Sequence, residues 1–136
     1  MPIPFPSDEW IKALQDVLNT DDEYARIAHN WEGDLLFVVE PTAAHIKPIY
    51  LYMDLWHGKC RDARTLLDLT EKKTAFLLSA PLAVFQRILQ GTLDPMQAMM
   101  TRQLKVAGSM SYMMRNVPTV LKFVKCTTKI DSEFAL

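Results

Sequence analysis

The sequence predicts an α+β fold in which one sheet is layered with helices. Short apolar runs bounded by Gly and Pro are typical of strands, and other stretches repeat their apolar residues at helical spacing. These strands and helices are segregated in groups, which indicates an α+β fold and not a parallel, doubly wound sheet. The chain of 136 residues contains no long linker-like stretch, so we expect residues 1–136 to form a single domain.

Two amphipathic helices are predicted at the start of the chain. Ser7 and the two acidic residues after it form a helix-capping signal, and apolar residues from Trp10 to Leu18 then recur at helical spacing. A second helix is expected to begin near Asp21 and to extend past Trp31 to Gly33, where glycine ends it.

Four strands are predicted next. Residues 35–39 form a continuous apolar run, which is typical of a central strand covered on both faces. In residues 49–56 the aliphatic side chains alternate with aromatic and acidic ones, and the His57-Gly58 pair then marks a turn into a more polar strand at residues 61–69. We expect these three strands to form a meander, and residues 74–79 repeat the apolar strand signal.

The second half of the chain is predicted to be mainly helical. Pro81 suits the first turn of a helix that runs to Gly91, and a short helix follows from the Asp94-Pro95 pair. Residues 103–107 read as a short fifth strand. Residues 110–121 then carry apolar side chains at helical spacing with Pro118 among them, which predicts a last helix.

The composition disfavours several classes of function. The formal net charge of -1 leaves no global attraction to a nucleic-acid backbone. No apolar run approaches the length of about 20 residues that spans a bilayer, and the first residues lack a secretory leader pattern. We therefore expect a cytoplasmic protein that does not bind nucleic acid, with Cys60 and Cys126 as reduced thiols.

No pattern of polar residues predicts a metal, a cofactor or a catalytic group. The three histidines lie far apart and without the spacing of metal ligands. Ser79, Ser109 and Ser111 lack the Gly-x-Ser-x-Gly elbow that activates a nucleophile in many hydrolases. We therefore expect a protein that is not an enzyme.

Methionines are concentrated in one part of the chain. Six of the eight lie within residues 96–114. Methionine is unbranched and polarisable, so it adapts to ligands of varied shape and suits a promiscuous apolar site. The alternative is that these residues fill gaps in an ordinary core, and composition alone favours that alternative. The six residues are Met96, Met99, Met100, Met110, Met113 and Met114.

The order of motifs in this region resembles the sterol carrier protein type 2 family. A Gly-Thr-Leu-Asp-Pro turn at residues 91–95 precedes a short apolar helix, and a Leu-Lys-Val strand follows at residues 104–106. A Gly-Ser-Met sequence at residues 108–110 then opens the Met-rich helix. The resemblance covers about residues 7–125. The sequence departs from the family pattern at Arg102 and Gln103, which stand where the family has Gly and Lys.

The resemblance implies a five-stranded, mostly antiparallel sheet covered by helices around an apolar tunnel. Members of the family bind fatty acyl chains, acyl-CoA or sterols there and bring no catalytic residue. A largely apolar pocket needs few polar groups to orient such a ligand. The candidate lining residues are Phe37, Leu51, Met53, Phe76, Leu78, Phe85, Leu89, Met99, Met100, Met110, Met113, Met114, Val117 and Leu121.

Three functional hypotheses follow. The first is non-catalytic binding, with transfer, of an apolar lipid, which includes transient contact with a membrane or a lipid enzyme. Lys122, Lys125 and Lys129 would meet anionic headgroups in that case, although a solvated face is the more common role of such a run. The second is an accessory protein that presents an isoprenoid or quinone-like lipid to a biosynthetic enzyme. The third is an enzyme that acts on an acyl substrate, and it has the least support.

Overall fold

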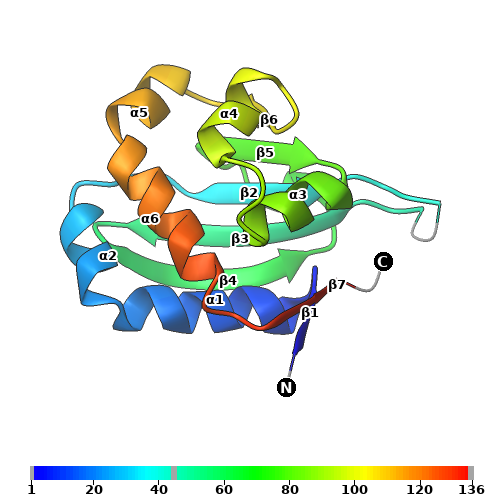
Figure 1. The fold of residues 1–136 in the computed structure, drawn as a ribbon, viewed down its shortest axis with the longest axis horizontal. Coiled ribbons are helices and arrows are strands. Elements are labelled where there is room, and N and C mark those ends of the chain that lie inside the picture. Colours follow the sequence, from blue (N-terminus) through cyan, green and yellow to red (C-terminus); the bar gives the residue numbers. More distant parts are fainter. Residues whose placement is uncertain (1, 44–45, 135–136) are drawn as a thin grey trace.

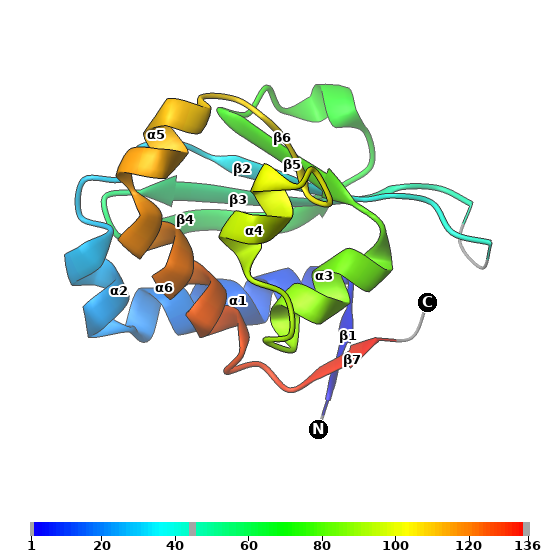
Figure 2. The ribbon, with the colours of Figure 1, turned by 45° about the horizontal axis from the view of Figure 1, so that its top comes forward.

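The computed structural model describes residues 2–43 and 46–134. Its main feature is a five-stranded sheet with the strand order β4-β3-β2-β5-β6, and most of the helices lie over one face of it (Figures 1 and 2). All neighbouring strands pair antiparallel except β2 and β5, which pair parallel, so the predicted fold class is confirmed. The strands are β2 Leu35–Val39, β3 Ile49–Trp56, β4 Lys59–Leu66, β5 Phe76–Ala80 and β6 Lys105–Ala107.

The predicted meander and central strand are both present. β2, β3 and β4 pair antiparallel in chain order, and β2 occupies the middle of the sheet. The more polar strand was expected at residues 61–69 but spans Lys59–Leu66. The reason is that His57 and Gly58 both have positive φ, which makes a two-residue hairpin that returns the chain directly into pairing.

Two helices precede the sheet, as predicted. The Ser7 hydroxyl accepts a hydrogen bond from the Trp10 amide and caps α1. α2 is shorter than expected and does not reach Trp31, because the chain turns at Ala28 and then runs beside the β3–β4 hairpin, where the Trp31 carbonyl accepts from the His57 amide at 2.7 Å. The two helices are α1 Asp8–Thr20 and α2 Asp22–Ile27.

The predicted last helix is divided into two. The backbone of Asn116 leaves helical geometry, and Pro118 lacks the N–H that a continuous helix would need there. Proline is instead well suited to the first turn of the new helix. The helices of the second half are α3 Leu82–Leu89, α4 Pro95–Met100, α5 Met110–Arg115 and α6 Val117–Thr127.

A second, two-stranded sheet was not predicted. β1 (Ile3–Phe5) pairs parallel with β7 (Ser132–Phe134), so both ends of the described chain lie side by side (Figure 1). The Phe5 and Phe134 rings are 5.7 Å apart, and the Trp10 indole donates to the Ser132 hydroxyl at 2.8 Å. Alternating prolines at the start of the chain conceal the strand pattern. Among the helices of the described ranges, none is long and apolar enough to cross a membrane.

The main core fills the space between the sheet and the helices. Alternate residues of β2, such as Leu35 and Val39, face this core, and the buried apolar residues of α1 meet them there. A smaller cluster on the opposite face joins Leu36, Tyr52 and Leu66, so the central strand is covered on both faces.

Candidate functional site

An apolar cavity lies between the sheet and the helices. Its volume is about 90 Å³, and 22 residues line it, which come from β1, β2, β3, β5, all six α-helices and the loops at Trp31 and Leu104. Close-packed protein interiors contain few voids larger than a water molecule, and a void needs only about 10–15 Å³ to hold one. The cavity is therefore several times larger than an ordinary packing defect.

The wall of this cavity contains no charged side chain. Five lining residues carry a polar group, and four of those groups have partners within the protein. The Trp10 and Trp31 indoles donate to Ser132 and to the Gly33 carbonyl, and the hydroxyls of Thr119 and Thr127 donate to backbone carbonyls. Tyr24 is the fifth. The interior is thus suited to apolar matter and repels ions.

Aromatic rings line one side of the cavity. The Phe37 ring from β2 stacks on Phe123 of α6 with centroids 6.0 Å apart and meets Phe85 of α3 edge-on at 6.2 Å. Phe85 in turn lies 6.2 Å from Phe5, which packs against Trp10 at 4.6 Å. The methionines Met99 and Met113 lie among the other lining residues, so the cavity has both rigid and adaptable walls.

The cavity extends toward the surface between three helices. Leu89 of α3, Pro95 of α4, and Val120 and Val124 of α6 line it and yet are only half-buried. Nearly all other lining residues are buried. The half-buried lining residues of the helices thus lie on α3, α4 and α6.

Comparison with known proteins assigns this architecture to a family. The family model described as the SCP-2 sterol transfer family matches residues 11–120, which is most of the chain. The chain belongs to the SCP-2 sterol transfer family. The resemblance found in the sequence is therefore confirmed. A search of curated proteins found no significant match.

Solved structures agree with this assignment to the SCP-2 family. A crystal structure of sterol carrier protein 2 is 30% identical with a TM-score of 0.84, covering 91% of this chain and 97% of that one. A conserved hypothetical protein from Thermus thermophilus, suggested to be a sterol carrier protein, is 29% identical with a TM-score of 0.83, covering 93% and 90%. UbiJ-SCP2, a ubiquinone synthesis protein, shares the fold at 14% identity and a TM-score of 0.55, covering 93% and 94%.

Seven of the fourteen residues predicted for an SCP-2 type ligand site line the cavity. They come from the sheet, from α3 and from the Met-rich region. Many other lining residues, including Trp10, Tyr24 and Trp31, were missed because their patterns indicate only helix or core. The seven are Phe37, Leu51, Leu78, Phe85, Leu89, Met99 and Met113.

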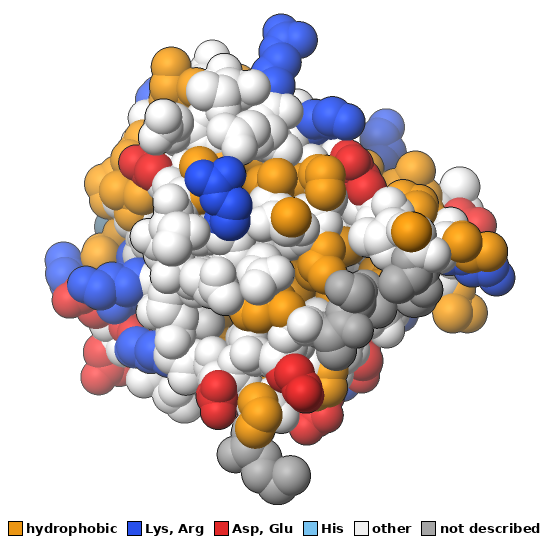
Figure 3. All heavy atoms as spheres, turned by 45° about the vertical axis from the view of Figure 1, so that its right-hand side comes forward, with side chains coloured by type: hydrophobic (Ala, Val, Ile, Leu, Met, Phe, Trp, Pro, Cys, Tyr) orange, Lys and Arg blue, Asp and Glu red, His pale blue; other side chains and the backbone are white. Residues whose placement is uncertain are grey.

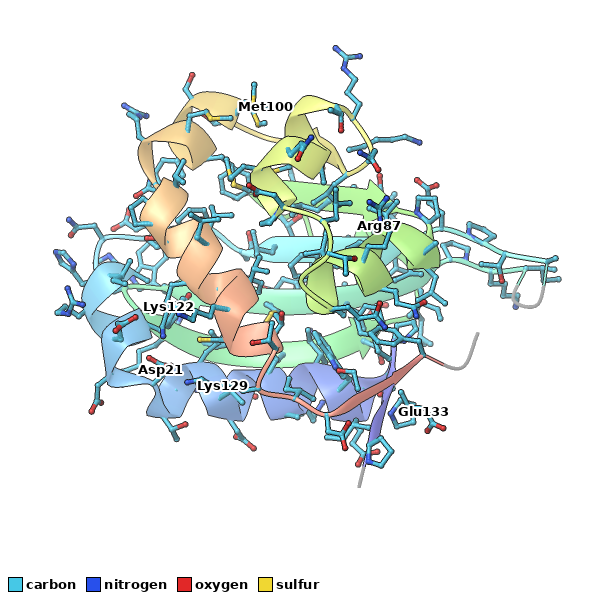
Figure 4. All side chains as sticks on the ribbon, viewed as in Figure 1. Asp21, Arg87, Met100, Lys122, Lys129 and Glu133 are labelled. Carbon is cyan, nitrogen blue, oxygen red and sulfur yellow. The ribbon has the colours of Figure 1, made fainter. Side chains whose placement is uncertain are left out.

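The other seven predicted residues lie outside the cavity wall. Met53 and Phe76 are buried in the core beside it, and Met110 and Val117 are half-buried. Met100, Met114 and Leu121 have exposed fractions of 71%, 41% and 44%, and Figure 4 shows Met100 on the outer side of α4. The single inward stripe expected over residues 110–121 does not form, because the break at Asn116 rotates α6 relative to α5.

A charge cluster built on the largely buried side chains of Asp21 and Lys122 attaches α6 to the first two helices. The Asp21 carboxylate accepts from Lys129 at 2.6 Å and lies 3.4 Å from Lys122, which also pairs with Glu23. Figure 4 shows Asp21, Lys122 and Lys129 together where α6 passes the α1–α2 junction. The hydrogen bond from Lys129 and that from the Tyr24 amide hold the pKa of Asp21 well below its usual value. The cluster is positioned to fix one side of the cavity wall.

The two cysteines lie at this same side of the molecule and are buried. Burial raises the pKa of the Cys60 thiol to about 12, and it also raises the pKa of Cys126. Both thiols are therefore protonated at neutral pH and poor nucleophiles. Within residues 2–43 and 46–134, no group of three or more His, Cys, Asp or Glu side chains is arranged to hold a metal ion.

Proposed function

We propose that this protein binds an apolar lipid inside the cavity, without turning it over, and transfers it to a membrane. The observation that carries the proposal is the uncharged wall, in which 22 residues present hydrocarbon and aromatic surface to an internal space. Membership of the SCP-2 sterol transfer family supports the same function. A wall of this kind provides no nucleophile, general base or cation for catalysis.

The cavity must widen when a lipid enters. Its volume of about 90 Å³ is well below the roughly 300–1,000 Å³ of typical ligand pockets. The sheet is held by its ladder of hydrogen bonds, whereas α3 and α4 are short helices, each with one half-buried lining residue, Leu89 and Pro95. Met99 and Met113 change shape at small cost. We infer that α3 and α4 move outward and that the two methionines repack around the ligand.

Burial of hydrocarbon supplies the binding energy. Removing apolar surface from water contributes about 25 cal/mol per Å², so a ligand that buries about 300 Å² gains roughly 7 kcal/mol. Part of this gain is offset by the cost of association and by the work of widening the cavity. The net affinity is then moderate, which suits a protein that must also release its lipid.

Presentation of an isoprenoid or quinone-like lipid to a biosynthetic enzyme is a second proposal for the same cavity. The observation in its favour is that the ubiquinone synthesis protein UbiJ-SCP2 shares the fold. A complex with such an enzyme that survives purification would favour presentation over membrane transfer.

The binding proposal is tested by filling the cavity. Met113 lines it and is buried, whereas its neighbour Met114 is exposed and lies outside the wall. We expect Met113→Trp to weaken binding of the fluorescent hydrocarbon 1,6-diphenylhexatriene at least tenfold, because the indole occupies the ligand's space. The free energy of unfolding should fall by only about 1–3 kcal/mol, as is usual for overpacking.

Met114→Trp is the matched control and should leave the affinity within twofold of the wild type. Fluorescence titration measures both affinities, and denaturant unfolding confirms that both variants fold. Unchanged affinity in folded Met113→Trp would overturn the proposal. Incubation with a palmitoyl ester should release no acid above background, and protein-dependent release would favour an enzyme instead.

A further inference from the structure

One residue that lines the cavity carries a hydroxyl without a partner. Tyr24 of α2 lines the cavity and is only 1% exposed. The backbone amide of Tyr24 donates to the Asp21 carboxylate. Within the described ranges, its hydroxyl forms no hydrogen bond with any side chain or backbone group. Every fully buried side-chain oxygen or nitrogen of those ranges does have a partner. The Tyr24 hydroxyl therefore keeps a small accessible surface, and it belongs to a residue that lines the cavity.

An unpaired hydroxyl in such a wall costs free energy in the empty protein. Leaving a buried donor without a partner is penalised, and buried tyrosines usually find one. The four other polar groups of the wall follow this rule, since each has a partner within the protein. Tyr24 is the exception in the described wall, and its hydroxyl is free to bind a group that enters the cavity.

The surroundings of Tyr24 select the chemistry of that group. Burial, with a smaller contribution from nearby Cys60 and Cys126, raises the pKa of the phenol, so the hydroxyl stays protonated and can donate. Both thiols are neutral at pH 7 because their pKa values are also raised. Lys122 and Lys129 pair with Asp21, and neither they nor Arg26, two positions from Tyr24, line the cavity.

The carboxylate of a fatty acid that entered the cavity would therefore lack a counter-ion. Burying an unpaired anion costs far more than one hydrogen bond returns. A neutral carbonyl or hydroxyl oxygen accepts the same hydrogen bond with little desolvation cost. We propose that Tyr24 anchors a neutral oxygen group of the bound lipid, so that the cavity prefers a long-chain alcohol, ketone or similar neutral lipid to a fatty-acid anion. This inference rests on the lipid-binding function proposed above.

Removal of the single hydroxyl tests the inference. Tyr24→Phe is expected to lower the affinity for 1-hexadecanol and 2-hexadecanone by about three- to tenfold, which is the usual contribution of one hydrogen bond. The affinities of hexadecane and of 1,6-diphenylhexatriene should stay unchanged, because neither carries an oxygen. Displacement of bound 1,6-diphenylhexatriene from the full-length protein measures all of these ligands in one assay. Palmitate at pH 8 should displace the probe more weakly than 1-hexadecanol from the wild type.

Tyr112→Phe is the matched control, because it deletes the same atom outside the cavity wall. The Tyr112 hydroxyl accepts from the Glu32 amide at 2.9 Å, so this variant should lower the thermal midpoint and keep the ligand preference. Tyr24→Phe should leave the midpoint of the empty protein unchanged or raised, since no bond is lost. A clear fall would reveal a structural role and overturn the inference.

The two proposals fail in different ways. If the wild type does not bind 1,6-diphenylhexatriene, the proposed lipid-binding function is overturned, and the inference about Tyr24 is overturned with it. Two results would overturn only the Tyr24 inference while the probe still binds. The first is that Tyr24→Phe loses no affinity for either oxygenated ligand. The second is that palmitate displaces the probe as effectively as 1-hexadecanol does.

Discussion

At the scale of single residues, Asp21 connects the start of α2 with the C-terminal part of the chain. The sequence marks it as the start of the second helix, and its carboxylate does accept from the Tyr24 amide at 2.8 Å. The same carboxylate also receives Lys122 and Lys129 from the other end of the chain and accepts from the Cys126 thiol at 3.7 Å. These partners are about a hundred positions away, so no local pattern indicates them. Only the fold brings them together.

We predict that Asp21→Asn lowers the free energy of unfolding at pH 7 by about 2 kcal/mol, because asparagine keeps the helix cap but loses the charged pairs. The folded pKa of Asp21 is lowered from 3.8, so its carboxylate stabilises the fold above that pH. This contribution disappears as the pH falls through the lower, folded pKa. The difference between the wild type and the variant should therefore shrink below about pH 4.

Denaturant unfolding between pH 7 and pH 2 measures this difference. Asp62→Asn is the control, because Asp62 pairs with Arg64 on the exposed surface and such pairs contribute about 0–1 kcal/mol. A difference at pH 7 no larger than that of the control, or one that does not change with pH, would contradict the role assigned to Asp21.

At the scale of helices and strands, local chemistry accounts for most of the agreement between the predicted and observed elements. β2 matches its predicted bounds at residues 35–39, because a continuous apolar run between Gly33 and Pro41 has few other solutions. The disagreements arise where tertiary contacts decide. β1 exists only because β7 pairs with it, and periodicity alone does not show that residues 110–121 bend at Asn116. Met113 and Met114 both precede the bend, and only Met113 lines the cavity because adjacent residues of a helix point in different directions.

The β3–β4 hairpin positions α2, and through it Tyr24. Gly58 has a φ of +79°, and a Cβ at this position would lie 2.6 Å from the Ala25 carbonyl oxygen in α2. Gly91 has nearly the same φ of +78°, but nothing lies within 4 Å of the corresponding position. A substitution at Gly91 therefore tests backbone strain alone, whereas one at Gly58 tests backbone strain together with a steric clash between the hairpin and α2.

We predict that Gly91→Ala costs about 1 kcal/mol of unfolding free energy, which is the strain of a positive φ alone. Gly58→Ala should cost about 3 kcal/mol or more, because the hairpin and α2 must also separate. Thermal or denaturant unfolding of both variants gives the comparison. Equal losses would mean that the close approach of Gly58 to α2 does not contribute to the fold.

At the scale of the whole molecule, charge is distributed unevenly although the net charge is only -1. Residues 95–130, which hold α4, β6, α5 and α6, contain six Lys and Arg and no carboxylate, while nine Lys and Arg share the rest of the chain with all sixteen carboxylates. In Figure 3, several basic side chains stand at the upper end of the molecule, and acidic ones gather at its lower end. Exposed Met100, Met114 and Leu121 belong to the same cationic segment.

This arrangement would turn the α4–α6 side, which carries half-buried residues of the cavity wall, toward an anionic membrane. Each basic residue near such a surface contributes about 1 kcal/mol. Within the described ranges Arg102, Arg115 and Lys125 form no ion pair, so their charges are available. Changing all three to Gln should weaken binding to phosphatidylglycerol-containing vesicles by about a hundredfold at low salt. Binding of the wild type should also decrease as salt is added.

The control changes the net charge equally but on other surfaces, by replacing Arg26, Lys59 and Lys73 with Gln. Vesicle co-sedimentation of both triple variants, with and without the anionic lipid, separates position from total charge. If docking depends on the cationic segment, only the first variant dissociates, and its affinity for 1,6-diphenylhexatriene stays normal because none of its three positions lines the cavity. Equal weakening by both variants would show that net charge alone attracts the protein, and that the α4–α6 side has no special role in delivering the lipid.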